Sequence, residues 1–233
     1  PQMAAKWARD VADNEAFTFT VKLWSQFTHA LKDPYPSEAE VQQTRAGFEP
    51  LQQAGRLTGI LAQFPFYFRD STENRDRLKR IASDFSEFPR VLAVRDSLWA
   101  TSEALSFIAS LGYNIACLDM PLTKRSFREK AITTGNIAYL RLHGRNYDAW
   151  FSKDAGRDER YNYLYNDQQL DFTAERVREL EEQSTRTVVV WNNHYQGKAV
   201  ANAFQLMHRF KEGAVDIPEL LKLSFPQLKQ IAS

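Results

Sequence analysis

The chain contains a single cysteine among its 233 residues, and this scarcity excludes a disulfide framework. Cys117 lies in the apolar run Ile115–Leu118, which predicts a buried and unreactive thiol. A reduced cysteine is typical of a reducing compartment, so we expect a cytoplasmic location. No apolar run approaches the roughly 18 residues of a membrane span, and no signal peptide is visible. We therefore expect no membrane partner.

The sequence also lacks an excess of charge of either sign. Thirty basic residues against 29 acidic residues give a net charge of +1, too small to drive binding to nucleic acid or membranes. Any basic function must therefore be local. The composition, 43% hydrophobic and 25% charged, is that of an ordinary globular protein, and no linker divides the chain. We predict one domain over residues 1–233.

The signatures of common catalytic sites are absent as well. No G-x-G-x-x-G follows the first predicted strand, and the sequence has no H-E-x-x-H, C-x-x-C, P-loop or G-x-S-x-G. The candidate metal ligands near strand ends are too few for a multi-metal centre: Asp96, Asp119, His143 and His194. We therefore predict no metal site, and the sequence indicates no particular cofactor.

What the sequence does contain is a repeated alternation of apolar runs and amphipathic stretches. The predicted strands are Phe17–Trp24, Leu57–Gln63, Val91–Val94, Ile115–Leu118, Ile137–Leu142 and Thr187–Trp191. The predicted helices are Pro36–Gln53, Asn74–Glu87, Ser102–Leu111, Arg125–Thr133, Ala174–Gln183 and Lys198–Phe210. This order indicates a parallel sheet.

The number of strand–helix units bears on the architecture. Six units are visible, and the chain opens on a helical segment, so two further units at the N-terminus would give the eight of a closed barrel. We therefore expect an α/β fold of the TIM (β/α)8-barrel type that lacks its first two strand–helix units. An open, doubly wound sheet is the alternative, and the missing dinucleotide motif weighs against it.

Side-chain alternation along the predicted strands places polar residues on one face. Phe17, Phe19, Val21 and Leu23 form an apolar face, which turns Lys22 to the other side. The predicted ring of polar residues at one mouth of the barrel comprises Lys22, Gln63, Arg95, Asp119, Arg141 and His143, completed by Asn192, Asn193 and His194 from the last strand.

The charges of this ring favour an anionic ligand. Three cations face one carboxylate, and buried charges are costly unless they are paired. The planar fork of arginine suits phosphate or carboxylate, which makes Arg141 and Arg145 candidates. Gly197 opens the last predicted helix, where free N–H groups favour an anion.

The connection of residues 147–170 is the longest in the chain and carries Tyr161, Tyr163 and Tyr165. Long connections are often functional, so Tyr161 and Tyr163 are candidates for a lid over the polar site. Structural roles stay open for all these residues: an Arg–Asp scaffold pair, a solvated Lys22, a structural His143, Asn192 and Asn193 as turn residues, and tyrosines that pin the loop to the rim.

The same motifs resemble the YecE-like family, a bacterial and archaeal domain of unknown function. The resemblance covers nearly the whole chain and is carried by Arg141-Leu-His-Gly-Arg145, Arg160-Tyr-Asn-Tyr-Leu-Tyr165 and Asn192-Asn-His-Tyr-Gln-Gly-Lys-Ala199. It implies a TIM-barrel-like fold with two more strands at the start. The chain departs from the family pattern Glu-Phe-Arg-His-Pro-Ser-Trp, because it reads Ala93-Val-Arg95-Asp96-Ser-Leu-Trp99.

These observations predict an anion-binding barrel mouth and leave open whether the protein is an enzyme. One hypothesis is a hydrolase- or lyase-like enzyme acting on a phosphorylated or carboxylated small molecule, with His143, His194 and Asp119 as the catalytic candidates, since histidine titrates near neutral pH. The alternative is a non-catalytic protein that binds a nucleotide or nucleic acid by stacking its bases on aromatic side chains.

Overall fold

The computed structural model describes residues 1–127, 131–211 and 213–233, and its chain divides into two compact units. Unit 1 comprises Pro1–Ala116 with Arg125–Phe127, and unit 2 comprises Cys117–Lys124 with Arg128–Ser233. The strands are hydrogen-bonded in chain order, from β1 to β6. The pairs β1–β2, β2–β3, β3–β4 and β5–β6 are parallel, as the strand–helix alternation predicts. The single domain stays a prediction.

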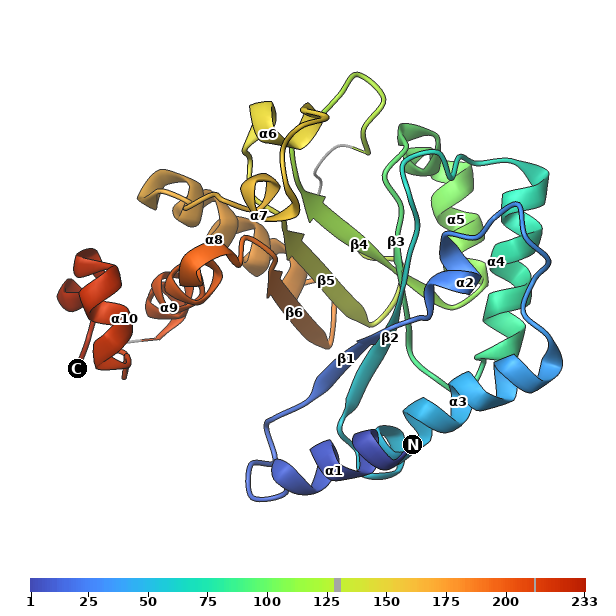
Figure 1. Ribbon diagram of the computed structural model, residues 1–233, viewed down its shortest axis with the longest axis horizontal. Coiled ribbons are helices and arrows are strands. Elements are labelled where there is room, and N and C mark those ends of the chain that lie inside the picture. Colours follow the sequence, from blue (N-terminus) through green and yellow to red (C-terminus); the bar gives the residue numbers. More distant parts are fainter. Residues whose placement is uncertain (128–130, 212) are drawn as a thin grey trace. The chain divides into compact units, whose positions relative to one another are not determined.

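Unit 1 begins with a helix, as expected. Its elements are α1 (Gln2–Asp10), β1 (Phe19–Lys22), α2 (Ser25–Thr28), α3 (Glu38–Gln53), β2 (Leu57–Gln63), α4 (Thr72–Asp84), β3 (Arg90–Ala93), the 3-10 turn η1 (Ser97–Ala100), α5 (Ser102–Ser110) and the first part of β4 (Tyr113–Asp119). Helices α4 and α5 lie side by side (Figure 1), joined by an ion pair between Arg75 and Glu103 with Nη1 and Oε1 2.9 Å apart.

Local sequence signals account for where these helices begin. Ser37 caps α3 in a capping box: its Oγ accepts a bond from the Glu40 amide, and Glu40 accepts one from the Ser37 amide. Ser71 and Thr101 cap α4 and α5 through their hydroxyl oxygens. Each cap satisfies an N–H group that has no partner within its helix.

The core of unit 1 is rich in aromatic side chains. The rings of Phe64 and Phe68 stack with centroids 3.8 Å apart, and Phe68 stacks on Trp99 at 5.6 Å. The buried Trp99 indole donates to the carbonyl of Phe68. Trp99 therefore fixes the segment that follows β3.

The predicted helix Arg125–Thr133 is wrong where the structure describes it. Residues 125–127 are non-helical and pair with the segment after β3, because Ser126 bridges to Asp96 and the Phe127 amide donates to the Arg95 carbonyl. Residues 131–133 are also non-helical, and residues 128–130 lie outside the described residues. The helix pattern failed because these backbone groups bond across to another segment rather than along their own chain.

Unit 2 contains the end of β4 and the second half of the chain. Its elements are β5 (Ile137–Leu142), α6 (Tyr147–Phe151), α7 (Arg157–Arg160), α8 (Asp167–Glu181), β6 (Arg186–Trp191), the 3-10 turn η2 (Tyr195–Gly197), α9 (Lys198–Phe210), α10 (Glu219–Ser224) and the 3-10 turn η3 (Pro226–Gln230). The predicted bounds of β2, β5 and α9 match the structure.

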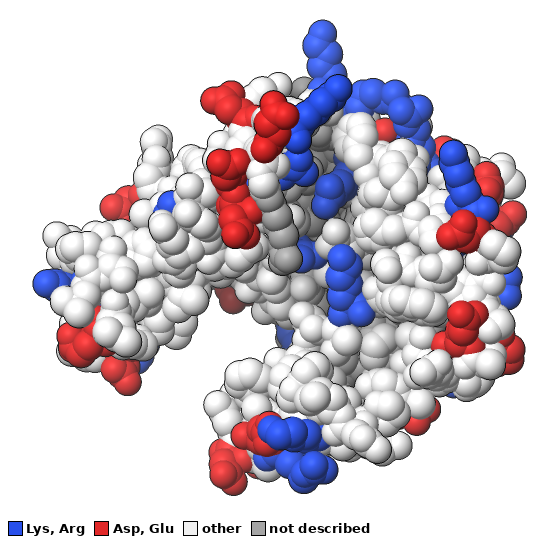
Figure 2. Space-filling model, in the orientation of Figure 1, with Lys and Arg blue, Asp and Glu red and all other residues white. Residues whose placement is uncertain are grey.

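Two apolar clusters hold unit 2 together. The first includes Cys117, whose thiol is buried as predicted, with the apolar face of β5 and the inner side of α8. The second joins α9 to the C-terminal segment through Ala201, Val215, Phe225 and Leu228. None of the helices that the structure describes in either unit is long and apolar enough to cross a bilayer. Figure 2 shows side chains of both charge signs on the visible face, in keeping with the net charge of +1.

Candidate functional site

Strand β5 places its polar side chains as the alternation predicts. Ala138, Leu140 and Leu142 are fully buried and pack in the apolar cluster with α8. Arg141 therefore turns to the other face, and His143 follows directly after the strand. The Arg141 side chain is half-buried and His143 is only 1% exposed.

Asp119, at the end of β4, is matched by Arg145 rather than by Arg141. The Arg145 Nε lies 2.9 Å from one carboxylate oxygen of Asp119, and its Nη2 lies 2.6 Å from the other. Asp119 is completely buried, and its carbonyl accepts the His143 amide at 2.8 Å. Bidentate hydrogen bonding of this kind is the strong form of an arginine–carboxylate pair, so the Asp119 carboxylate orients Arg145.

Arg141 instead donates to the amide oxygen of Asn192, with Nη2 and Nε at 3.1 and 3.3 Å from Oδ1. The Asn192 amide nitrogen lies 3.3 Å from the Nδ1 of His143. Burial is the strongest influence on Arg141 and lowers the pKa of its guanidinium, against smaller opposing influences from Tyr139 and Tyr161. Burial thus removes part of the hydration of this guanidinium, and the Asn192 amide oxygen accepts bonds from two of its nitrogen atoms.

A group of rings surrounds His143 and His194. The centroid of the Tyr161 ring lies 6.1 Å from the centroid of the His143 ring and 5.2 Å from that of the His194 ring. The Trp150 ring of α6 packs against the rings of both His143 and Tyr161, with centroid distances of 5.8 and 5.7 Å. His194 donates through Nδ1 to the Asn192 carbonyl at 2.8 Å, and its Nε2 lies 4.0 Å from a carboxylate oxygen of Asp158.

The other two tyrosines of the long connection have a structural role. Tyr165 is buried, and its hydroxyl accepts the Gly144 amide. The Tyr163 carbonyl accepts a bond from the amide of Asn193, and the Tyr163 hydroxyl accepts one from Gln169. These contacts pin the connection in place. Tyr161, which contacts both histidines, is the tyrosine placed to meet a ligand.

Sequence reasoning missed Asn202 as part of this arrangement. Its amide oxygen accepts bonds from the Tyr165 amide and the Asn193 side chain, and its amide nitrogen donates to the Tyr165 carbonyl. Asn202 is fully buried in α9, so it ties the helix to two site loops. An asparagine in the middle of an amphipathic helix was the signal, because it is a poor helix former and needs a reason to be buried.

The turn before α9 uses two left-handed residues. Gln196 has a φ of 52° and Gly197 a φ of 81°, and Gly197 is the residue that precedes the first turn of α9, as predicted. Gly197 tolerates this conformation because it has no Cβ. Its position at the helix start is observed, and its role as an anion ligand stays a prediction.

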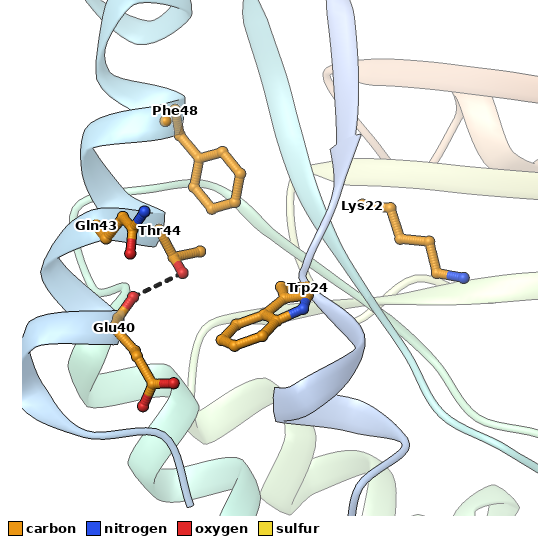
Figure 3. A pocket seen from close by; sticks show the side chains of 7 residues that line it. Lys22, Trp24, Glu40, Gln43, Thr44 and Phe48 are labelled. Carbon is orange, nitrogen blue, oxygen red and sulfur yellow. Dashed lines mark hydrogen bonds between the residues drawn. The ribbon is translucent and has the colours of Figure 1, made fainter.

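The remaining predicted residues lie in unit 1, where Lys22 is exposed and Gln63 and Arg95 are partly buried. The pKa of His29 is lowered by burial first, and then by the positive charges of Lys22 and Arg95. A cleft of about 370 Å³ is lined by Lys22, Trp24, Glu40, Gln43, Thr44, Gly47 and Phe48. Figure 3 shows the Lys22 amino group extending away from the side chains of α3. The shared pocket for the whole ring stays a prediction.

Asp96 takes a structural role in unit 1. It is completely buried, its Oδ1 accepts the Leu98 amide at the start of η1, and its Oδ2 lies 3.6 Å from both Arg69 and Arg125. Across residues 1–127, 131–211 and 213–233, no three histidine, cysteine or acidic side chains gather as a metal site would require.

Parallel strands that alternate with helices, and that end in arginine, histidine and asparagine, define an α/β protein with a candidate polar site at its strand ends. The chain belongs to the family described as "Protein of unknown function DUF72", whose model matches residues 1–224. The resemblance to the YecE-like family therefore holds at the level of this family.

A curated protein and two proteins with solved structures are similar to the chain. The chain is 27% identical to the UPF0759 protein YunF of Bacillus subtilis over 214 residues, which span 87% of this chain and 75% of that protein. A DUF72 family protein of Thermotoga maritima (TM1631) has a solved structure with a TM-score of 0.81 and 31% identity, over 90% of this chain and 80% of that one. A second, from Enterococcus faecalis (EF0366), has a TM-score of 0.80 and 25% identity, over 94% and 82% of the two chains.

Proposed function

We propose that the polar strand ends of unit 2 bind a small molecule that carries a phosphate or a carboxylate, and that the protein is a hydrolase- or lyase-like enzyme acting on it. The observation that carries this proposal is the environment of the Arg141 guanidinium. Its pKa is lowered by burial, and the amide oxygen that it contacts is neutral. An anion beside the guanidinium would offset the lost hydration and could accept two parallel hydrogen bonds from it.

The side chains around Arg141 supply the remaining parts of such a site. Arg145 is held in one orientation by Asp119, so it is a second cation placed in advance. His143 and His194 are the acid–base candidates. The bonds that Asp119 accepts from Arg145 support a positioning role for this carboxylate rather than direct proton transfer.

Nucleotide or nucleic-acid binding is the second candidate, and one feature of α6 favours it. Tyr147 and Phe151 are 58% and 45% exposed, and their ring centroids lie 4.8 Å apart. Exposed aromatic rings are the surfaces on which bases stack. A nucleotide would combine this stacking with a phosphate at the cationic residues of the same unit.

We further propose that the complete fold is a TIM barrel, that the protein is a YecE-like member of its family and that it works in the cytoplasm. Parallel strands in chain order support the barrel. The single cysteine, the buried Cys117, supports a reducing compartment. An experimental structure that shows whether the sheet closes decides the first of these, and cell fractionation decides the location.

The experiment that tests the main proposal is calorimetric titration of the full chain with phosphate, sulfate, a dicarboxylate and a nucleoside monophosphate. We expect Arg141→Ala to weaken binding by about 1.5–3 kcal/mol and Arg141→Lys to restore part of it, because an ammonium lacks the planar fork. Arg9→Ala, at an exposed position of α1, is the matched control. Equal affinities in all four proteins would overturn the proposal. Binding of the nucleotide alone would favour the second candidate.

A further inference from the structure

Asn192 contacts two histidines with two different polar groups. Its side-chain nitrogen lies 3.3 Å from the Nδ1 of His143, and its backbone carbonyl lies 2.8 Å from the Nδ1 of His194. We infer that Asn192 is a positioning residue that gives these histidines opposite protonation patterns, so that His194 exchanges protons and His143 stays a neutral donor. This inference rests on the proposed function and assigns the acid–base role within it.

The orientation of the Asn192 amide follows from Arg141. A guanidinium has hydrogen-bond donors and no acceptor, so the group that lies 3.1 Å from Arg141 must be the amide oxygen. The amide nitrogen then faces His143, and this nitrogen can only donate. The Nδ1 of His143 therefore accepts, and the proton of the neutral ring sits on Nε2.

The backbone sets the opposite pattern at His194. A carbonyl oxygen only accepts, so the Nδ1 of His194 carries a proton whether the ring is neutral or charged. The nitrogen that gains and loses a proton is then Nε2. The His194 side chain is 45% exposed, and its Nε2 lies 4.0 Å from the carboxylate of Asp158. Solvent access suits a group that exchanges protons during a reaction.

Charging His143 would require a proton on Nδ1, opposite an amide that is itself a donor. The Asn192 amide would have to rotate, which would break its bonds with Arg141. Arg141, through this amide, and Tyr161, whose ring also contacts His194, are titratable groups of unit 2 that lie close to His143. His143 is also almost fully buried. The arrangement therefore disfavours a second proton on His143 and leaves Nε2 as the proton-accepting nitrogen of His194.

The test is a nitrogen-15 spectrum of the histidine side chains, recorded on the uniformly labelled full chain between about pH 5 and 8. The four histidines are assigned with His143→Gln and His194→Gln. We expect His143 to show a protonated Nε2 and an unprotonated Nδ1 across this range. We expect His194 to show a protonated Nδ1 across the same range. A protonated Nδ1 on His143, or titration of His143 in this range, would overturn the inference.

Two variants separate a positioning role from a merely structural one. Asn192→Ala removes the side chain and keeps the carbonyl, so His143 should lose its single pattern while His194 keeps its own. Asn192→Asp offers only acceptors, so the proton of His143 should move to Nδ1. If both variants leave His143 unchanged, the inference fails. Melting temperatures establish that each variant is folded. Because no ligand is added, the protonation patterns can hold while the anion titrations fail, which separates this inference from the proposed function.

Discussion

Arg145 donates hydrogen bonds to the buried carboxylate of Asp119 through two nitrogen atoms, with Nε 2.9 Å from Oδ1 and Nη2 2.6 Å from Oδ2. The Arg145 side chain remains 33% exposed while Asp119 is inaccessible to solvent. The pair therefore joins the end of β4 to the segment after β5 and holds the guanidinium in a fixed orientation.

Removing the carboxylate should weaken both the fold and the site. Asp119→Asn leaves a neutral amide in place of the two charge-assisted acceptors, and we expect a loss of about 1–3 kcal/mol in the free energy of unfolding. The partial exposure of Arg145 keeps this below the cost of breaking a fully buried pair. Urea denaturation measures it, with an unchanged slope showing that stability alone has changed.

Asp171→Asn is the matched control for this pair. Asp171 also accepts a bond from an arginine, Arg209, at 2.7 Å, but its side chain is 65% exposed. Its loss should cost less than about 1 kcal/mol. If the two variants are equally stable, the burial of Asp119 contributes nothing and the pair is no stronger than a surface contact.

A second prediction concerns Arg90, which caps two helices of unit 1 from within the core. Its Nη1 donates to the carbonyls of Phe85, Ser86 and Phe88 after α4, and its Nη2 donates to Leu111 after α5. Arg90→Met should remove these bonds and leave carbonyls without partners, at a cost of at least about 2 kcal/mol. Thermal unfolding of the variant measures the loss.

Arg56 provides a control with the same chemistry at the surface. It donates to the carbonyls of Asn14, Glu15 and Ala12, and these bonds are exposed. Arg56→Met should cost less than Arg90→Met because water can replace the lost donors. Equal losses would mean that burial does not set the contribution of Arg90.

The sequence predicts the elements of this protein better than it predicts their contacts. The bounds of β2, β5 and α9 agree with the structure, because apolar periodicity is a local property. Strand parity also placed Arg141 correctly on the face opposite the apolar side chains. The arginine that pairs with the Asp119 carboxylate is Arg145, which lies beyond the strand. Strand parity says nothing about a segment whose path depends on tertiary contacts.

The dependence on tertiary contacts also explains the other differences between the predicted and the observed elements. The pattern of Arg125–Thr133 predicts a helix, but the Phe127 amide donates to the Arg95 carbonyl and the Arg125 carbonyl accepts the Ser97 amide. The sequence predicts one long connection over residues 147–170, and the structure has the short helices α6 and α7 within it. The two bonds of Asn192 to different histidines depend on side-chain and backbone geometry together, which no spacing in the sequence encodes.

A third prediction concerns Gly144, which lies between β5 and α6 with a φ of 90°. A Cβ at this position would lie 2.7 Å from the Cβ of Tyr163, an atom that cannot move without its backbone. Gly144→Ala should therefore destabilise the protein by the strain of the left-handed conformation plus a clash, about 2–3 kcal/mol in all.

Gly213 is the control that separates the conformational strain from the clash with Tyr163. Its φ is 87°, and nothing lies within 4 Å of the Cβ that alanine would add. Gly213→Ala should carry the conformational strain alone, about 1 kcal/mol. Urea denaturation of both variants gives the difference, and a difference near zero would mean that the Tyr163 segment moves aside freely.

The last prediction is the pH dependence that His29 imposes on unit 1. Burial lowers the pKa of His29, and the positive charges of Lys22 and Arg95 lower it further. The unfolded chain then binds a proton at His29 more readily than the folded chain. The stability tied to neutral His29 is complete above about pH 6.5 and is lost as the pH falls through the lower, folded-state value. The free energy of unfolding should therefore decline on acidification across this window, and His29→Gln should flatten the decline.

Lys22→Met should flatten this decline in part, because Arg95 and burial still act on the His29 ring. Urea denaturation at intervals between about pH 5 and 8 gives the slopes. Parallel slopes in the wild type and His29→Gln would show that His29 does not set the decline. Parallel slopes in the wild type and Lys22→Met would show that Lys22 does not act on His29.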